Sequence, residues 1–261
     1  MRYSRYVALG DSTTEGIDDP LPGGGFAGWA DRLAGRLARE NPGLLYANLA
    51  IRGRKAGQIR AEQLPPALAM EPDLASVIGG INDILRPRVD LRQVLADVEA
   101  TIAALLDAGA TVLTMTYPDT SPVMPAARPT LKRVFAFNRA LRGIAERHGA
   151  VLLDIERDGL IDARLWADDR LHANADGHAR IAHAAAHALG VEPDEYPWTP
   201  LPPAEQLRRA RAWAHEVVWA GRYMAPWIVR RVRGRSSGDG IAAKRPELAP
   251  VDPVTARVSP R

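Results

Sequence analysis

The 261-residue chain contains no cysteine, and this absence removes several classes of chemistry at once. Without thiols it can form no disulfide, no zinc-thiolate site and no cysteine nucleophile, so any nucleophile must be an oxygen or an amine. The chain also lacks an apolar run of about 18 residues, the length that a membrane-spanning helix needs. No apolar stretch of about 7 to 15 residues follows the first few residues, as a secretory signal would require. We therefore expect a cytoplasmic protein.

Aromatic residues are scarce at 6%, but hydrophobic residues as a whole make up 46% of the sequence. That share is enough for a sizeable core in one large α/β domain with an extension. Charge is unevenly distributed, because residues 1–202 hold 22 Lys and Arg against 26 Asp and Glu, whereas residues 203–245 hold 10 against 3. The net charge of +3 therefore reflects the C-terminal part and indicates little about the main domain.

Apolar runs of strand length alternate with segments of helical periodicity along the first 190 or so residues. The predicted strands are residues 5–9, 44–50, 74–78, 111–116 and 150–154. The predicted helices are residues 27–40, 57–70, 91–108, 130–148 and 175–189. Strand followed by helix, repeated five times, predicts right-handed crossovers and a five-stranded parallel sheet covered on both faces.

Small polar clusters follow the first three predicted strands, and a fourth precedes the last predicted helix. In chain order these clusters are residues 10–12, 48–53, 79–83 and 168–172. Parallel sheets gather their functional groups beyond the carboxyl ends of the strands. The four clusters are therefore predicted to converge on one site.

Ser12, in the first cluster, is the candidate nucleophile. A serine hydroxyl is a poor nucleophile near neutral pH, so it needs a histidine to accept its proton and usually a carboxylate to orient that histidine. The three-residue spacing of Asp169 and His172 lets one loop present both groups. An acyl-transfer intermediate also needs donors for its oxyanion, and the candidates are the N–H of Gly53 and the side-chain amide of Asn82.

Four sequence blocks resemble those of the GDSL, or SGNH, hydrolase family and occur in the same order. They are Gly10-Asp-Ser-Thr-Thr-Glu-Gly16, Asn48 to Gly53, Gly80-Ile-Asn-Asp83 and Asp169-x-x-His172. The resemblance covers residues 5 to about 190 and departs from the family pattern at Thr13, where leucine is frequent. It implies a flavodoxin-like three-layer α/β/α sandwich that hydrolyses carboxylic esters, as a GDSL-type esterase or lipase, through an acyl-enzyme.

The same resemblance implies a role for each candidate residue. Ser12 would be the nucleophile, His172 the base and Asp169 the carboxylate that orients His172. The N–H groups of Ser12 and Gly53, with the amide of Asn82, would form the oxyanion hole. No cofactor and no metal are implied, and the expected partner is a small-molecule ester.

One alternative is a non-catalytic flavodoxin-like module that binds a phosphate or nucleotide at a helix N-terminus. However, residues 10–16 contain neither Gly-x-Gly-x-x-Gly nor Gly-Lys-Ser/Thr, and their two acidic residues oppose an anion. A metal site on His183 and His187, spaced i, i+4, lacks the intervening glutamate and a third ligand. Asp11 is expected to form structural hydrogen bonds, and Asp168 lacks the three-residue spacing to His172.

The alcohol and acyl parts of the substrate have weaker signals. Phe26, Val123 and Met124 come from two Pro/Gly-rich loops at the expected edge of the site. They either line an acyl pocket or anchor those loops. Lipase, thioesterase and carbohydrate deacetylase substrates all stay open at this point.

We divide the chain into a catalytic domain (1–202), a basic amphipathic helical extension (203–233) and a flexible tail (234–261). The extension has apolar residues at helical spacing and seven arginines from 208 to 233. Either residues 207–233 lie on an anionic membrane surface, or they pack on the more acidic domain. A nucleic-acid partner is not expected, because the aromatic residues belong to the apolar stripe. Glycine and serine after residue 233 favour a flexible tail.

Overall fold

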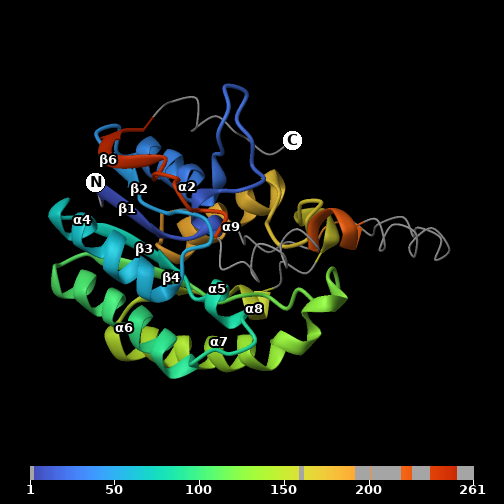
Figure 1. The fold of residues 1–261 in the computed structure, drawn as a ribbon. Helices are drawn as coiled ribbons and strands as arrows, with labels where there is room; N and C mark the ends of the chain where they lie inside the picture. The colour runs from blue at the N-terminus through green and yellow to red at the C-terminus, as the bar shows by residue number, and fades with distance from the viewer. Residues whose placement is uncertain (1–2, 159–161, 192–200, 202–218, 225–235, 252–261) are drawn as a thin grey trace.

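The computed structural model describes residues 3–158, 162–191, 201, 219–224 and 236–251. Among these, a six-stranded sheet has the order β5-β4-β3-β1-β2-β6 (Figure 1). Strands β1 to β5 pair in parallel, and β6 runs antiparallel to β2. The strands are β1 (Arg5–Gly10), β2 (Leu45–Asn48), β3 (Leu74–Ile78), β4 (Thr111–Met115), β5 (Val151–Leu153) and β6 (Arg245–Pro250).

Helices cover both faces of the sheet, α2 and α9 packing together on one face and α6 and α7 on the other (Figure 1). The α-helices are α1 (Ser12–Glu15), α2 (Gly28–Glu40), α3 (Ala56–Gln58), α4 (Leu64–Ala69), α5 (Ile81–Ile84), α6 (Leu91–Asp107), α7 (Arg128–His148), α8 (Ile155–Asp158) and α9 (Ala175–Ala188). Short 3₁₀ or π turns are η1 (Ile59–Gln63), η2 (Pro125–Ala127), η3 (Ala163–Leu165) and η4 (Ala220–Met224). The predicted three-layer α/β/α architecture is confirmed.

The five predicted strands and four of the five predicted helices occur with small shifts at their ends. The predicted helix 57–70 is instead divided into α3, the π turn η1 and α4. Pro65 and Pro66 occupy the start of α4. Because proline has no N–H to donate to the preceding turn, a regular helix cannot run through this point.

The helices begin and end at residues that satisfy their unpaired backbone groups. The side chain of Asp90 accepts the N–H groups of Arg92 and Gln93 at the start of α6. Asn174 accepts the N–H of Gly177 at the start of α9, just after the fourth polar cluster. Such caps fix where each helix starts, and hence where the preceding loop lies.

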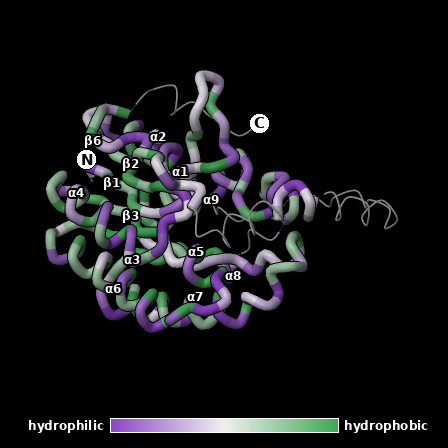
Figure 2. Tube along the Cα trace, in the orientation of Figure 1, coloured by the Kyte–Doolittle hydropathy of each residue, from purple (hydrophilic) through white to green (hydrophobic). Residues whose placement is uncertain are grey.

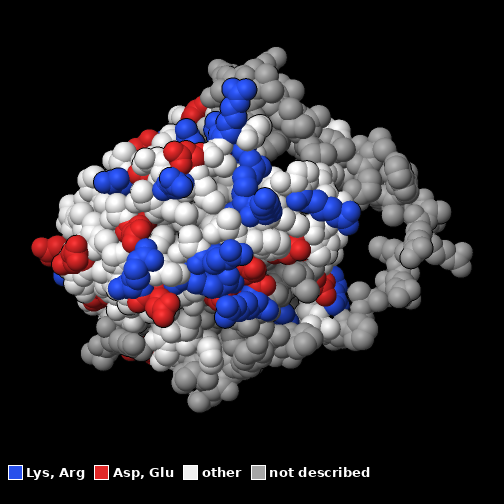
Figure 3. Space-filling model, turned by 90° about the horizontal axis from the view of Figure 1, so that it is seen from below, with Lys and Arg blue, Asp and Glu red and all other residues white. Residues whose placement is uncertain are grey.

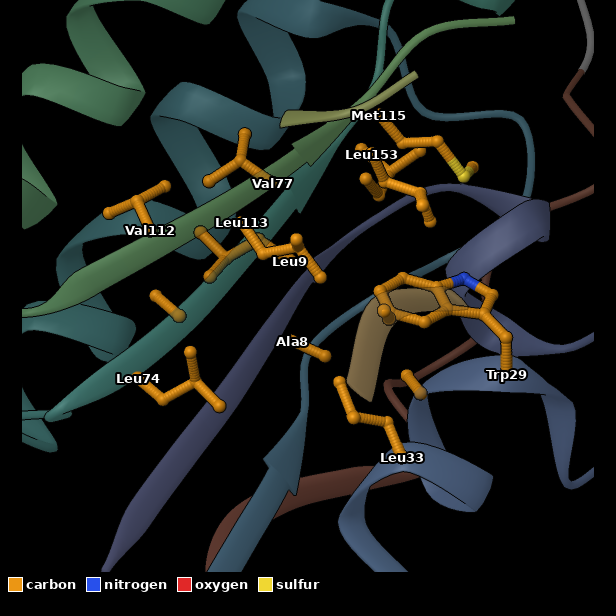
Figure 4. Packing of buried hydrophobic residues seen from close by; sticks show 14 of the residues in the cluster. Ala8, Leu9, Trp29, Leu33, Leu74, Val77, Val112, Leu113, Met115 and Leu153 are labelled. Atoms are coloured by element: carbon orange, nitrogen blue, oxygen red, sulfur yellow. The ribbon is translucent and has the colours of Figure 1, made fainter. Parts of the chain in front are cut away.

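The core lies between the sheet and its helices. β3 is buried at every position, as a strand covered on both faces must be. Figure 4 shows Trp29 and Leu33 of α2 lying beside Ala8 of β1, and all three side chains are fully buried. Hydrophobic residues concentrate in the strands, whereas the helices alternate between hydrophobic and polar residues (Figure 2).

The sixth strand corrects two predictions, because the sheet is not five-stranded and the tail 234–261 is not flexible over β6. β6 pairs with β2, with Tyr46 opposite Ala249 and Asn48 opposite Arg245. Prolines at both ends of the pairing are tolerated because β6 is the edge strand of the sheet, with no further strand beside it among the described residues. Glycine and serine content indicated a flexible tail here, but strand formation depends on the partner strand, which composition does not report.

Residues 202–218 and 225–235, which make up most of the predicted helical extension and of the proposed membrane-binding segment, lie outside the described residues. Within the described part of the chain, no helix combines the length and apolarity needed to cross a bilayer. Figure 3 shows Lys and Arg side chains interspersed with Asp and Glu on one face of the molecule.

Candidate active site

Ser12 lies where the sequence predicted, at the carboxyl end of β1 and in the first position of α1. The carboxylate of Asp11 caps this short helix by accepting the N–H of Thr13 at 3.1 Å. Its other oxygen accepts the side-chain amide of Asn82 at 3.0 Å, which ties the first polar cluster to the third. Burial raises the pKa of Asp11 to about 6. The predicted structural role of Asp11 is therefore confirmed.

A chain of hydrogen bonds links Ser12 to the fourth polar cluster. Ser12 Oγ lies 2.9 Å from His172 Nε2, and His172 Nδ1 lies 2.6 Å from Asp169 Oδ2. The other oxygen of Asp169 accepts the backbone N–H groups of Leu171 and His172 at 2.9 and 3.0 Å. Since its own loop holds the carboxylate, Asp169 can fix both the position and the orientation of the imidazole ring.

A second carboxylate, which sequence reasoning missed, also faces the histidine. Asp18 Oδ2 lies 3.5 Å from His172 Nδ1, and Asp18 has a left-handed backbone conformation with φ of 69°. The next residue, Asp19, is buried in a two-point ion pair with Arg32 at 2.7 and 2.8 Å. In the sequence, the signal that could have indicated this second carboxylate was the pair of acidic residues, Asp18 and Asp19, just after the block that contains Ser12.

These carboxylates set the charge of His172. Burial by itself lowers the pKa of the imidazole, but hydrogen bonds to Asp169 and Asp18 and their negative charges outweigh it and raise the pKa to about 9. Burial likewise opposes ionisation of Asp169, but its bond to His172 holds the pKa of that carboxyl below its usual value. The two carboxylates therefore favour the protonated, imidazolium form of His172.

The same three residues are the one group in the described part of the chain whose ligand atoms are close enough to share a metal ion, within 4.8 Å of one another. His172 Nδ1, the ring nitrogen nearest to both carboxylates, already bonds Asp169. A cation would have to displace that hydrogen bond.

The other two predicted oxyanion donors, Gly53 and Asn82, line the same cleft as Ser12. Gly53 has a φ of 76°, a backbone conformation that residues other than glycine rarely adopt. Asn82, in α5, is held by Asp11 and by the carbonyl of Arg54, which accepts its amide at 3.2 Å. The structure brings all five predicted site residues to the wall of one open cleft: Ser12, Gly53, Asn82, Asp169 and His172.

Two cavities meet at Ser12 and His172. The more enclosed one has a volume of about 80 Å³ and an apolar lining that includes Leu85, Met115, Val134, Ile155, Trp166 and Ile181. The open cleft has a volume of about 400 Å³, and its outer wall includes Arg52, Met124, Thr130, Trp219, Tyr223 and Ser237. Of the three acyl-pocket candidates, Met124 lines the open cleft, whereas Phe26 and Val123 line neither cavity.

Residues from outside the predicted catalytic domain form part of the open cleft. The indole N–H of Trp219 donates to the backbone carbonyl of Asp168 at 2.8 Å, and the guanidinium of Arg170 lies 4.7 Å from the centre of the Trp219 ring. Tyr223 lies beside Trp219, with ring centres 6.5 Å apart. The short turn around η4 therefore packs on the loop that carries Asp169 and His172.

His178, close to His172 in sequence, has a structural role. Its Nδ1 accepts the backbone N–H of Trp29 at 3.2 Å, and its Nε2 donates to the carbonyl of Ile17 at 3.0 Å. Burial lowers the pKa of His178 to about 4, so this ring is neutral near pH 7. It joins α9 to the loop that presents Asp18.

Comparisons with known proteins identify the family and relatives of the chain. The model of the GDSL-like Lipase/Acylhydrolase family matches residues 8–180. The chain is similar to an acetylxylan esterase of Geobacillus stearothermophilus, with 28% identity over 212 residues that cover 72% of this chain and 94% of that protein. The matched family segment contains all four polar clusters and ends before η4 and β6.

Two solved structures share the fold. One is LAE5, an α/β hydrolase enzyme from the metagenome of Lake Arreo, Spain, with 24% identity, a TM-score of 0.61, and coverage of 72% of this chain and 95% of that chain. The other is a catalytic mutant of Axe2, an acetylxylan esterase from Geobacillus stearothermophilus, with 22% identity, a TM-score of 0.63, and coverage of 74% and 98%.

Proposed function

The chain belongs to the GDSL-like lipase/acylhydrolase family, and we propose that it hydrolyses carboxylic esters with Ser12 as the nucleophile. The observation that carries this proposal is the hydrogen-bonded chain from Ser12 Oγ through His172 to Asp169. A serine hydroxyl needs such a neighbouring base and an oriented carboxylate before it can attack a carbonyl carbon.

In the proposed reaction, Ser12 Oγ attacks the ester carbonyl carbon while His172 Nε2 takes the hydroxyl proton. Asp169 stabilises the resulting imidazolium. The N–H groups of Ser12 and Gly53 and the amide of Asn82 donate to the oxyanion of the tetrahedral intermediate, each such donor being worth about 3 kcal/mol. The carbon–oxygen bond to the alcohol then breaks, and His172 returns the proton to the leaving oxygen.

The second half of the reaction regenerates the enzyme. Water enters the open cleft and gives a proton to His172 Nε2 as its oxygen attacks the acyl-enzyme carbonyl. The bond to Ser12 Oγ breaks, the proton returns to Ser12, and the free acid leaves. His172 must be neutral at the start of each half, so its raised pKa of about 9 predicts faster turnover in alkaline solution.

The two cavities support a division of the substrate into a short acyl group and a larger alcohol. The apolar cavity of about 80 Å³ is the smaller and more enclosed of the two, and it suits a short acyl chain. The alcohol product must leave to solvent, so the open cleft of about 400 Å³ suits the alcohol. The similarity to an acetylxylan esterase also supports an acetyl ester.

A phosphate-binding module receives no support from the site. The carboxylates of Asp11, Asp18 and Asp169 lie around Ser12 and His172 and would repel a phosphate.

The test is a series of p-nitrophenyl esters of increasing acyl length, assayed with the full chain and with Ser12→Ala. We expect acetate and butyrate to be cleaved with higher kcat/KM than decanoate, and Ser12→Ala to be inactive on all of them. Cleavage of decanoate in preference to acetate would overturn the short-acyl assignment. Equal activity of Ser12→Ala would overturn the serine mechanism itself.

A further inference from the structure

The C-terminal segment 236–251 lies outside the family match, yet it is in contact with the elements that carry the site. Besides the pairing of β6 with β2, it has two points of contact near Ser12. One is the side chain of Lys244, and the other is the turn formed by Ser236, Ser237 and Gly238.

Lys244 is largely buried and binds the ends of two helices at once. Its ammonium donates to the carbonyl of Glu15, the last residue of α1, at 2.7 Å. It also donates to the carbonyls of Phe26 and Ala27, just before α2, at 3.0 and 2.6 Å, and pairs with Asp31 at 2.5 Å. A charge with this many partners in a low-dielectric environment holds its surroundings in one arrangement.

Glu15, whose carbonyl accepts a hydrogen bond from Lys244, also holds the second polar cluster, residues 48–53, in place. The carboxylate of Glu15 is buried and accepts the backbone N–H of Arg52 at 2.6 Å. It forms a two-point ion pair with the Arg52 guanidinium through Nε, at 3.0 Å, and Nη2. The Arg52–Gly53 peptide, which contains the N–H proposed for the oxyanion hole, is thereby fixed to the helix that begins with Ser12.

The turn at residues 236–238 packs on the same peptide from the other side. Ser236 Oγ occupies the space that a side chain at position 53 would need, and the backbone carbonyl of Arg52 touches the position that a side chain at 238 would fill. Both positions are glycine. Ser237 lines the open cleft together with Arg52 and Gly53.

From these contacts we infer that segment 236–251 helps to position the groups of the active site and that Lys244 is a positioning residue. It fixes the helix of Ser12 against α2, and through Glu15 it fixes the Arg52–Gly53 peptide at the distance that the oxyanion requires. This inference rests on the proposed ester hydrolysis. The family match ends at residue 180, so the family model does not include Lys244 or the turn at residues 236–238.

The chain's lack of cysteine allows a direct test by chemical rescue. Lys244→Cys introduces a single thiol, and its alkylation with 2-bromoethylamine restores an ammonium at nearly the length of lysine. Because misplacement by about 1 Å can cost about a hundredfold in rate, we expect Lys244→Cys to lower kcat for p-nitrophenyl acetate at least about tenfold. KM should change little, aminoethylation should restore most of kcat, and a neutral thiol reagent should restore none.

A second variant covers the case in which Lys244→Cys fails to fold because Asp31 is left buried without a partner. Lys244→Met combined with Asp31→Asn removes both charges, and such replacements of a buried pair are often neutral for stability. We expect this double variant to fold and to show the same loss of kcat.

Arg245→Met is the matched control, since Arg245 directly follows Lys244 and begins β6, but it packs on Tyr46 and bonds the carbonyl of Pro250 instead. It should lower Tm without lowering kcat. If the unaltered chain shows no Ser12-dependent hydrolysis, the proposed function itself is wrong. If the unaltered chain is active and the folded Lys244 variants keep its kcat, or if Arg245→Met loses as much kcat as they do, only the positioning role is wrong.

Discussion

The four polar clusters and the C-terminal segment 236–251 both contribute to the same cleft, but only the clusters are visible in the sequence. Ser12, Asn82 and His172 each follow or precede an apolar element and carry a chemistry that can be named from residue type. β6 has two prolines within six residues and follows a glycine- and serine-rich stretch. It nevertheless pairs with β2 and brings Lys244 to the carbonyl of Glu15.

This difference separates two kinds of information. A reactive side chain at a strand end is a local signal, because the parallel sheet dictates where that end lies. An edge strand and a positioning lysine are defined by what they contact, and those partners are about 200 residues away in the chain. We therefore expect substitutions in the polar clusters to have large effects on rate. Substitutions in the C-terminal segment should affect both rate and stability.

The largest expected effect is that of Ser12→Ala or His172→Ala. Each should lower kcat by about 10⁴-fold or more, because loss of either member of such a pair removes the nucleophilic pathway. Steady-state assays on p-nitrophenyl acetate and a thermal melt would check this. Tm should stay close to that of the unaltered chain, since both side chains line the cleft. If either variant kept turnover within a factor of about ten of the unaltered chain, the substituted residue would not be part of the nucleophilic pathway.

Asn82→Ala should have the next largest effect. Loss of one oxyanion donor costs about 3 kcal/mol of transition-state stabilisation, or about a hundredfold in kcat. KM for p-nitrophenyl acetate should change little, because the donor acts mainly on the developing oxyanion. Asn82→Asp is a useful companion, since it keeps the shape but loses the amide. A variant in which KM rises and kcat is unchanged would show that Asn82 binds substrate instead.

The sequence predicted the parallel sheet and the positions of the site residues because both have local signals. Leu74–Ile78, apolar apart from Ser76, have the length and composition that are typical of a strand buried on both faces. The sequence could not predict Asp18, because its approach to His172 depends on a left-handed turn and on the burial of Asp19 against Arg32. The enclosed apolar cavity was also missed, because its lining comes from several elements that meet only in the folded chain.

Asp18→Asn should alter the pH dependence more than the maximal rate. His172 accepts the proton of Ser12 only when neutral, so kcat/KM should rise with pH and level off above the histidine pKa of about 9. Removing the Asp18 charge disfavours the imidazolium and lowers that pKa, so the rise should move to lower pH. A pH profile of p-nitrophenyl acetate hydrolysis, corrected for spontaneous cleavage, would check the shift. An unmoved profile would mean that Asp169 alone sets the charge of His172.

The smallest effect on rate is expected within β6 itself, away from Lys244. Leu248 is partly buried against the core, so Leu248→Ala should cost about 1 kcal/mol of unfolding free energy. Its kcat should equal that of the unaltered chain, as urea unfolding and a parallel assay would show. A large loss of kcat in Leu248→Ala would mean that any disturbance of the strand affects the site, and that a loss of kcat in the Lys244 variants is not specific to Lys244.

Covalent labelling can show whether Ser12 is the residue that carries the acyl group. The full chain would be treated with a fluorophosphonate ester, which reacts with activated serine hydroxyls, and the adduct would be located by peptide mass spectrometry. We expect one equivalent of label on Ser12, loss of esterase activity in proportion to labelling, and no label in Ser12→Ala or His172→Ala. Full loss of activity with the label on another residue, or an active chain that resists labelling at Ser12, would contradict this role of Ser12.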